Sequence, residues 1–167
     1  MILEPDSARS GALGEDGPYG VELELRRFRV RADEVVDVDL LRPIEADGSL
    51  ATDRPVVVFV HGGLVGRHRY RWLGRHLASR GFLVIAPGHL GDLAFLEQGN
   101  AIDALRAART ASTRPGDRLF GAMRPGPAAI VGHSLGGVVA SGLWNDAPGD
   151  FSHLVMLASY PARAGFR

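Results

Sequence analysis

The stretch "AAIVGHSLGGVVASGLW", residues 128–144, decides the fold that this sequence predicts. Its apolar start, AAIVG, indicates a buried strand, and the residues that follow the glycines indicate a helix over 136–146. Between the two lies Gly132-His133-Ser134-Leu135-Gly136, which fits the pattern G-x-S-x-G. A strand, this turn and a helix together are typical of the segment that holds a nucleophilic serine. The alternative is a glycine-rich turn with an ordinary capping serine.

A second glycine-rich turn supports the catalytic interpretation. His61-Gly62-Gly63 directly follows "VVVFV", residues 56–60, another continuously apolar strand. Two backbone N–H groups aimed at one point can stabilise an oxyanion. In the G-x-S-x-G geometry one of them comes from the residue after the nucleophile, here Leu135. The other comes from the loop after the earlier strand, so Gly63 or Leu64 is the expected donor.

The remaining periodicity predicts an α/β fold. Residues 19–30 and 36–40 alternate in polarity and indicate an antiparallel hairpin, after a loose segment at 1–18. Beyond it, strands and helices alternate, which favours a mostly parallel sheet with helices on both faces and a site at the carboxyl ends of the strands. The predicted strands lie at 56–60, 82–87, 128–132 and 154–158, and the helices at 67–80, from a cap at Asn100 onward, and at 136–146.

Composition narrows the possible functions. The chain has 167 residues, which suggests one domain, and its net charge is zero. This balance gives no electrostatic reason to expect nucleic acid as a partner. The chain has no cysteine, which excludes disulfides and a cysteine nucleophile. Neither a membrane-spanning run nor a secretory signal is recognisable, so a cytoplasmic location is the default and the true location stays open.

The motifs "HGG", "RGFLVIAPGHLGD" and "GHSLGG", taken in this order, resemble those of the α/β-hydrolase superfamily. The chain looks most like its dienelactone hydrolase, chlorophyllase, platelet-activating-factor acetylhydrolase-like and cutinase-like esterases, and "DGPYGVELELRRFRV" is similar to the strand entry of those enzymes. The resemblance covers roughly residues 17–161. It implies a three-layer α/β-hydrolase sandwich, present in part over 19–167 and truncated after about the sixth strand. It also implies a Ser-His-Asp hydrolase of small carboxylic esters that needs no cofactor.

The acid and the base of such a triad are not recognisable. In this fold they follow the serine in the order acid, then histidine. After Ser134 the candidates are Asp146, Asp150 and His153. We expect all three at the amino end of the sheet, about 17 Å from the serine across a five-residue strand. The catalytic Asp and His are therefore expected to be absent from this chain, which alone should be nearly inert.

Four residues near the two glycine turns are expected to line a substrate pocket, namely His61, Gly62, His89 and His133. His61 or His89 acting as an unorthodox base is one alternative to an external base. His68 and His76 are eight residues apart on one predicted helix, a spacing that does not favour a metal pair, so we expect no metal.

A different alternative is a non-catalytic protein of this fold that binds an acyl ligand. If residues 154–158 form the last strand of the sheet, its apolar edge is exposed, and such edges favour self-association. We therefore expect the chain to associate with itself through this edge.

Overall fold

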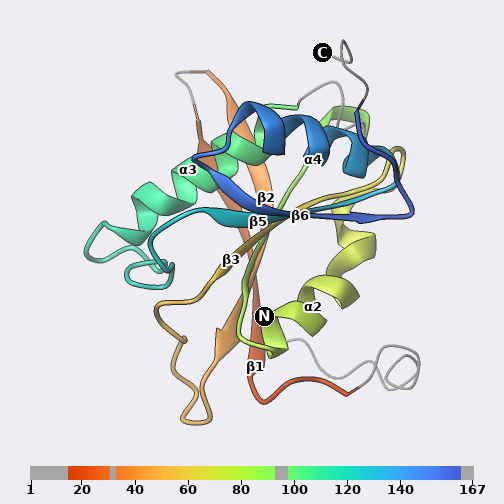
Figure 1. The fold of residues 1–167 in the computed structure, drawn as a ribbon. Coiled ribbons are helices and arrows are strands. Elements are labelled where there is room, and N and C mark those ends of the chain that lie inside the picture. The colour runs from red at the N-terminus through yellow and green to blue at the C-terminus, as the bar shows by residue number, and fades with distance from the viewer. Residues whose placement is uncertain (1–14, 31–32, 93–97, 163–167) are drawn as a thin grey trace.

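The computed structural model describes residues 15–30, 33–92 and 98–162, which form a six-stranded sheet flanked by helices (Figure 1). The strand order is β1-β2-β4-β3-β5-β6. β1 pairs antiparallel with β2 and β2 with β4, while β3 to β6 run parallel to one another. The strands are β1 (Gly20–Arg29), β2 (Val35–Ile44), β3 (Val56–Val60), β4 (Leu83–Pro87), β5 (Ala128–His133) and β6 (Phe151–Leu157). The predicted hairpin and parallel sheet are thus confirmed.

Helices cover both faces of this sheet, as the alternating pattern predicted. Figure 1 shows α3 and α4 on one side and α2 on the other. A short 3₁₀ turn, η1, leads into α2, and a second, η2, follows β4. The bounds are η1 (Arg67–Tyr70), α2 (Arg71–Ser79), η2 (Leu90–Asp92), α3 (Asn100–Ser112) and α4 (Leu135–Asp146).

The hydrophobic core lies in two layers, one on each face of the sheet. All five residues of β3 and all five of β4 are buried, because helices cover these strands on both sides. On one face Val58 and Ile85 join a cluster with apolar residues of α3 and α4. On the other face Val57 and Val84 join a smaller cluster that packs against α2. The three-layer sandwich follows from this division.

Three local expectations differ from the structure. The last strand begins at Phe151 rather than at residue 154, so His153 lies within β6. Asn100 is the first residue of α3 and not its cap, because its side-chain amide donates to the Gly88 carbonyl at 3.0 Å. The predicted helix over 67–80 is divided at Tyr70 into a 3₁₀ turn and α2.

The N-terminal segment expected to be loose is anchored where the structure describes it. Gly17 donates its backbone N–H to the Ser79 hydroxyl at 2.9 Å, and Asp16 pairs with Arg75 at 2.7 Å. These contacts tie residues 15–18 to the end of α2. The first 14 residues of the expected loose segment lie outside the described residues.

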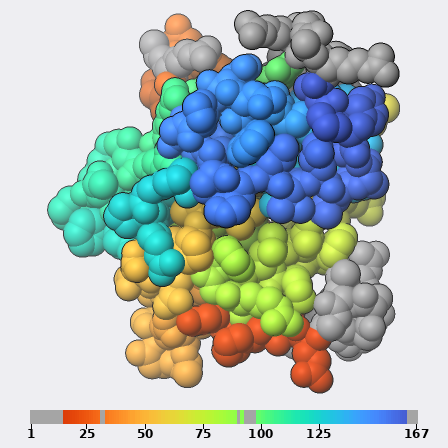
Figure 2. Space-filling view, in the orientation of Figure 1, coloured from red at the N-terminus to blue at the C-terminus, as the bar shows by residue number. Residues whose placement is uncertain are grey.

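β6 has a sheet neighbour on one side only, β5, within the described part of the chain. α4 and β6, both blue, occupy the upper part of the face seen in Figure 2, and α2 lies below them. Val155 on β6 is 44% exposed. Association through this strand stays a prediction. None of the described helices is long and apolar enough to cross a membrane.

Candidate active site

Four strained turns lie side by side at one rim of the sheet. Each of the parallel strands β3 to β6 is followed by a residue other than glycine with a positive φ. Such residues cost on the order of 1–3 kcal/mol each and gather at functional sites. They are Leu64 at 60°, Asp92 at 56°, Ser134 at 51° and Ala158 at 47°. The carboxyl ends of the strands are therefore the candidate site, in agreement with the rule for such sheets.

Ser134 occupies the turn between β5 and α4, with φ 51° and ψ −124°. Its N–H donates to the Leu157 carbonyl at 2.9 Å. Its carbonyl accepts from the Gly137 N–H at 2.9 Å and from the Ser159 hydroxyl at 2.6 Å. The backbone is thus held on both sides, whereas the hydroxyl has no hydrogen-bond partner among the described residues. The residue is exposed, so this hydroxyl is available to a ligand.

The glycines of the motif let α4 approach the sheet closely. A Cβ added at Gly136 would lie 2.3 Å from the carbonyl oxygens of both Val60 and His61. A Cβ added at Gly132 would lie 2.3 Å from the Gly136 carbonyl oxygen. Side chains at either position would push the helix away from β3 and β5. Close packing here fixes the start of α4 against the turn that follows β3.

The two candidate oxyanion donors come from segments in direct contact. A Cβ added at Gly63 would lie 3.0 Å from the Leu135 side chain. Leu135 is the first residue of α4, so its N–H has no partner within the helix. Leu64, by contrast, donates its N–H to the Asp92 carbonyl at 2.9 Å. This geometry favours Gly63 over Leu64 as the second donor.

Tyr70 connects the two glycine-rich turns, a contact that the sequence did not indicate. Its hydroxyl accepts the Gly62 N–H at 3.3 Å and lies 2.9 Å from His133 Nδ1. Because the hydroxyl accepts from Gly62, its own proton is available to His133. The ring packs against Phe59, with centroids 4.9 Å apart. In the sequence Tyr70 is only one apolar position of a helical pattern, and no local signal marks its contact with either turn.

His61 and His89 form a buried, hydrogen-bonded pair, and His89 also lines a cavity with Arg67, Gly88 and Asn100. His61 is fully buried, and its Nδ1 donates to the Gly62 carbonyl at 3.0 Å. Its Nε2 therefore carries a lone pair, which accepts from His89 Nδ1 at 2.9 Å. His89 Nε2 is then an unprotonated acceptor, buried and without a partner in the described structure. Both nitrogens of His61 are occupied, and no hydrogen bond joins either histidine to Ser134 in the described structure.

The pKa of His89 is lowered to about 3, first by burial and then by the nearby His61 and Arg67. The unfolded chain takes up this proton near pH 6.5, whereas the folded protein resists it down to about pH 3. Stability is therefore expected to fall as the pH decreases through this window, by about 1 kcal/mol per pH unit. In His89→Gln, the free energy of unfolding should change less with pH, as measured by urea unfolding between pH 7 and 4. His153→Gln, at an exposed position, should leave it unchanged; an equal slope in both variants would contradict the assignment.

The candidate acid and base residues after Ser134 lie at the other end of β5. Asp150 accepts the Ala128 N–H through its carbonyl at the start of that strand, and its carboxylate pairs with Arg106 at 2.7 Å. His153 is paired in register with Ala129, and its Nδ1 lies 2.8 Å from the Ser152 hydroxyl. Neither residue is brought toward Ser134.

The comparisons with known proteins agree with this geometry. A family model described as "Alpha/beta hydrolase family" matches residues 56–167, which is more than half of the chain. The match includes both glycine turns and all four parallel strands. No curated protein matches the chain.

Proposed function

Because the chain belongs to the alpha/beta hydrolase family, its function is of the hydrolase type, and we propose that it acts on carboxylic esters through Ser134. The observation that carries this proposal is the strained, exposed Ser134 at the start of α4, with an unpartnered hydroxyl among the described residues. A nucleophile in such a turn is held away from the backbone and open to substrate.

The proposed reaction has two steps. The Ser134 hydroxyl attacks the ester carbonyl and loses its proton to a general base, and the carbonyl oxygen becomes an oxyanion. The N–H groups of Leu135 and Gly63 stabilise that charge. The intermediate collapses as the alcohol leaves with a proton, and an acyl-serine remains. Water then attacks this ester, the acid is released, and the Ser134 hydroxyl is restored.

We also propose that the acid and the base of this reaction are absent from the 167-residue sequence. All six histidines lie in the described part of the chain, and none of them hydrogen-bonds Ser134. His61 and His89 bond to each other, and His133 bonds to Tyr70. A serine without a base keeps only the contribution of the oxyanion hole and of binding, about 10³–10⁴ over water.

Two measurements test whether Ser134 is the nucleophile of an esterase whose acid and base lie outside this sequence. The first is the DNA sequence beyond the codon for Arg167, and the second is ester hydrolysis by the longer product. An open frame that encodes two more strands, an Asp and a His is expected, and the longer product should hydrolyse p-nitrophenyl butyrate. Ser134→Ala should lower its kcat by about 10⁶. A stop codon, or turnover that survives Ser134→Ala, would contradict the proposal.

The second candidate is a non-catalytic protein that binds an acyl ligand. Exposed apolar side chains near the Ser134 turn favour it. Leu64 is 77% exposed, and Tyr160, next to Ser159, is 66% exposed. An acyl chain that binds beside Ser134 could cover these two side chains. This candidate predicts that the chain binds a short fatty acid with an affinity that Ser134→Ala does not change, and that it shows no ester turnover.

Tyr70→Phe is expected to slow the reaction of Ser134 with an electrophile about tenfold, because the variant loses both hydrogen bonds that join Gly62 to His133. The ring and its packing on Phe59 are kept, so the midpoint of unfolding should change little. The rate of phosphonylation by a fluorophosphonate ester, with imidazole supplied as base, measures the effect. Tyr19→Phe removes a hydroxyl that accepts from Arg54 and serves as the control. Equal rates in the two variants would contradict a positioning role.

A further inference from the structure

A basic groove lies between β1 and α3, away from the candidate active site. It has a volume of about 560 Å³, a size typical of small-molecule pockets. β1 is separated from β5, which directly precedes Ser134, by β2, β4 and β3. With strands about 4.8 Å apart, the groove is roughly 19 Å across the sheet from the Ser134 turn. Any ligand in the groove is therefore separate from the ester site.

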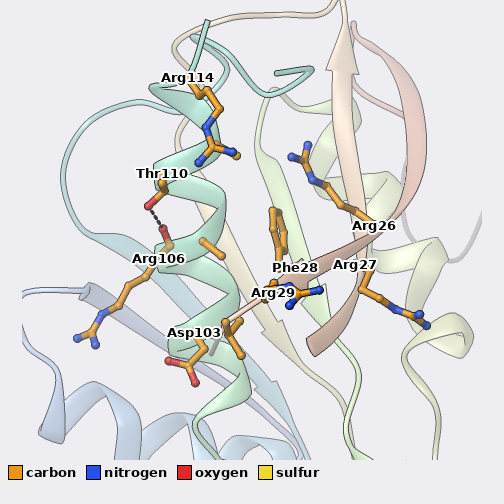
Figure 3. Close-up of a pocket in the computed structure, with 11 residues that line it drawn as sticks. Arg26, Arg27, Phe28, Arg29, Asp103, Arg106, Thr110 and Arg114 are labelled. Carbon is orange, nitrogen blue, oxygen red and sulfur yellow. Dashed lines mark hydrogen bonds between the residues drawn. The ribbon is translucent and has the colours of Figure 1, made fainter. Parts of the chain in front are cut away.

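The groove is lined by five arginines and one carboxylate. Arg26, Arg27 and Arg29 come from β1, and Arg106, Arg114 and Asp103 come from α3 or the turn after it. Small side chains of α3, at Ala107, Thr110 and Ala111, leave space between the two elements. Figure 3 shows Arg26 and Arg114 at one end of this space, with Phe28 beside them.

Four of these five arginines already have a partner, Arg29 among them, which leaves Arg114 as the side chain that a ligand would meet. Arg26 pairs with Asp117 at 2.6 Å, Arg27 with Asp37 at 2.7 Å and Arg106 with Asp150 at 2.7 Å. The Arg114 side chain is exposed and has no hydrogen bond or ion pair with any described residue. Its charge acts on the nearby Asp117 carboxylate, which is already paired with Arg26, so Arg26, Arg114 and Asp117 together keep one net positive charge.

The Arg26 side chain is held in one position at the same end of the groove. Two hydrogen bonds hold its guanidinium on the Asp117 carboxylate, at 2.8 and 2.6 Å. The guanidinium carbon also lies 4.8 Å from the centre of the Phe28 ring, which is buried. This arrangement fixes one side of the site, while Arg114 on the other side is free to close on an anion.

We propose that this groove binds a small polyanion of the phosphate type, with Arg114 as its main contact. Guanidinium groups bind phosphate and carboxylate oxygens in pairs. A planar carboxylate is satisfied by one such fork. A tetrahedral phosphate offers oxygens in several directions, which suits Arg26 on β1 and Arg114 in the turn after α3, on two sides of the space. The volume accommodates a molecule with more than one phosphate group.

Calorimetric titration of the 167-residue chain with tripolyphosphate in 20 mM salt tests the proposal. Wild-type protein is expected to bind one equivalent, and Arg114→Ala should raise the Kd about tenfold or more. Thr110→Glu places a carboxylate in the groove and should abolish binding with little change in the thermal midpoint, since this position is exposed. Arg69→Ala is the matched control, because Arg69 is also exposed and no described residue pairs with its guanidinium.

The Kd of Arg69→Ala is expected to stay within about twofold of the wild-type value, because this arginine lies in η1 and not in the groove. If Arg69→Ala and Arg114→Ala lost the same affinity for tripolyphosphate, binding would reflect general charge attraction, and the proposed site would be wrong. Absence of binding to wild-type protein would also contradict the site. Citrate binding as tightly as tripolyphosphate would contradict the phosphate class.

Discussion

Gly136→Ala is expected to destabilise the fold by more than about 4 kcal/mol, or to prevent folding altogether. The added Cβ would lie 2.3 Å from two backbone carbonyl oxygens, those of Val60 and His61. Neither can move without shifting the end of β3, which is buried in the centre of the sheet. The better helix propensity of alanine, worth about 1 kcal/mol, is too small to offset this clash. Urea unfolding followed by circular dichroism measures the loss.

Gly142→Ala is the matched control, because Gly142 lies in the same helix and an added Cβ there would meet no atom within 4 Å. This variant should be more stable than wild type by about 0.5–1 kcal/mol. If Gly136→Ala and Gly142→Ala unfolded at similar urea concentrations, the close contact of α4 with β3 would be contradicted.

Arg42→Met is expected to cost about 3–5 kcal/mol, the second large effect in this chain. Arg42 is 1% exposed on β2 and pairs with Glu22 on β1 and, at 2.8 Å, with Glu24. It also donates to the Arg118 carbonyl at 2.8 Å. Methionine keeps much of the volume but leaves two largely buried carboxylates without this partner. Chemical unfolding at pH 7 gives the change in free energy.

Two further variants decide whether charge or packing causes that loss. Glu22 still pairs with Arg118 and Glu24 still lies 3.7 Å from Arg26, but both lose the buried Arg42. Adding Glu22→Gln and Glu24→Gln to Arg42→Met removes the two charges that have lost this partner and should recover much of the stability. Arg27→Met breaks an exposed pair with Asp37 on the same two strands and should not shift the midpoint measurably. Failure of the triple variant to recover stability would assign the effect to packing.

The fold could be predicted from local sequence patterns because the order of apolar and polar residues depends directly on which residues are buried. The residues of β3 and β4 are apolar without interruption, as strands covered on both faces must be. The resemblance to the α/β-hydrolase superfamily rested on turns placed at the ends of such strands, and the family match over residues 56–167 agrees with it. Element ends were predicted less well. Phe151 begins β6 and His153 lies within it, because pairing with β5 extends the strand beyond its most apolar residues.

The candidate site was only partly predictable, because its side-chain contacts join residues that are distant in the sequence. Ser134 and Gly63 follow from motifs, whereas the bond between Tyr70 and His133 spans 63 residues. His61 and His89 were placed at the correct rim, but their burial and mutual hydrogen bond depend on how two loops pack. Polarity alone suggested that both histidines face a substrate pocket.

The most direct test of the central claim is covalent labelling of Ser134. A fluorophosphonate ester forms an oxygen–phosphorus bond with a nucleophilic serine and releases fluoride, and added imidazole can take up the serine proton. Intact mass measurement should show one adduct per chain, on the peptide that contains Ser134, formed faster as imidazole is added. Ser134→Ala should show none. An adduct that persists in Ser134→Ala, or no adduct on the wild-type chain at any imidazole concentration, would contradict a nucleophilic Ser134.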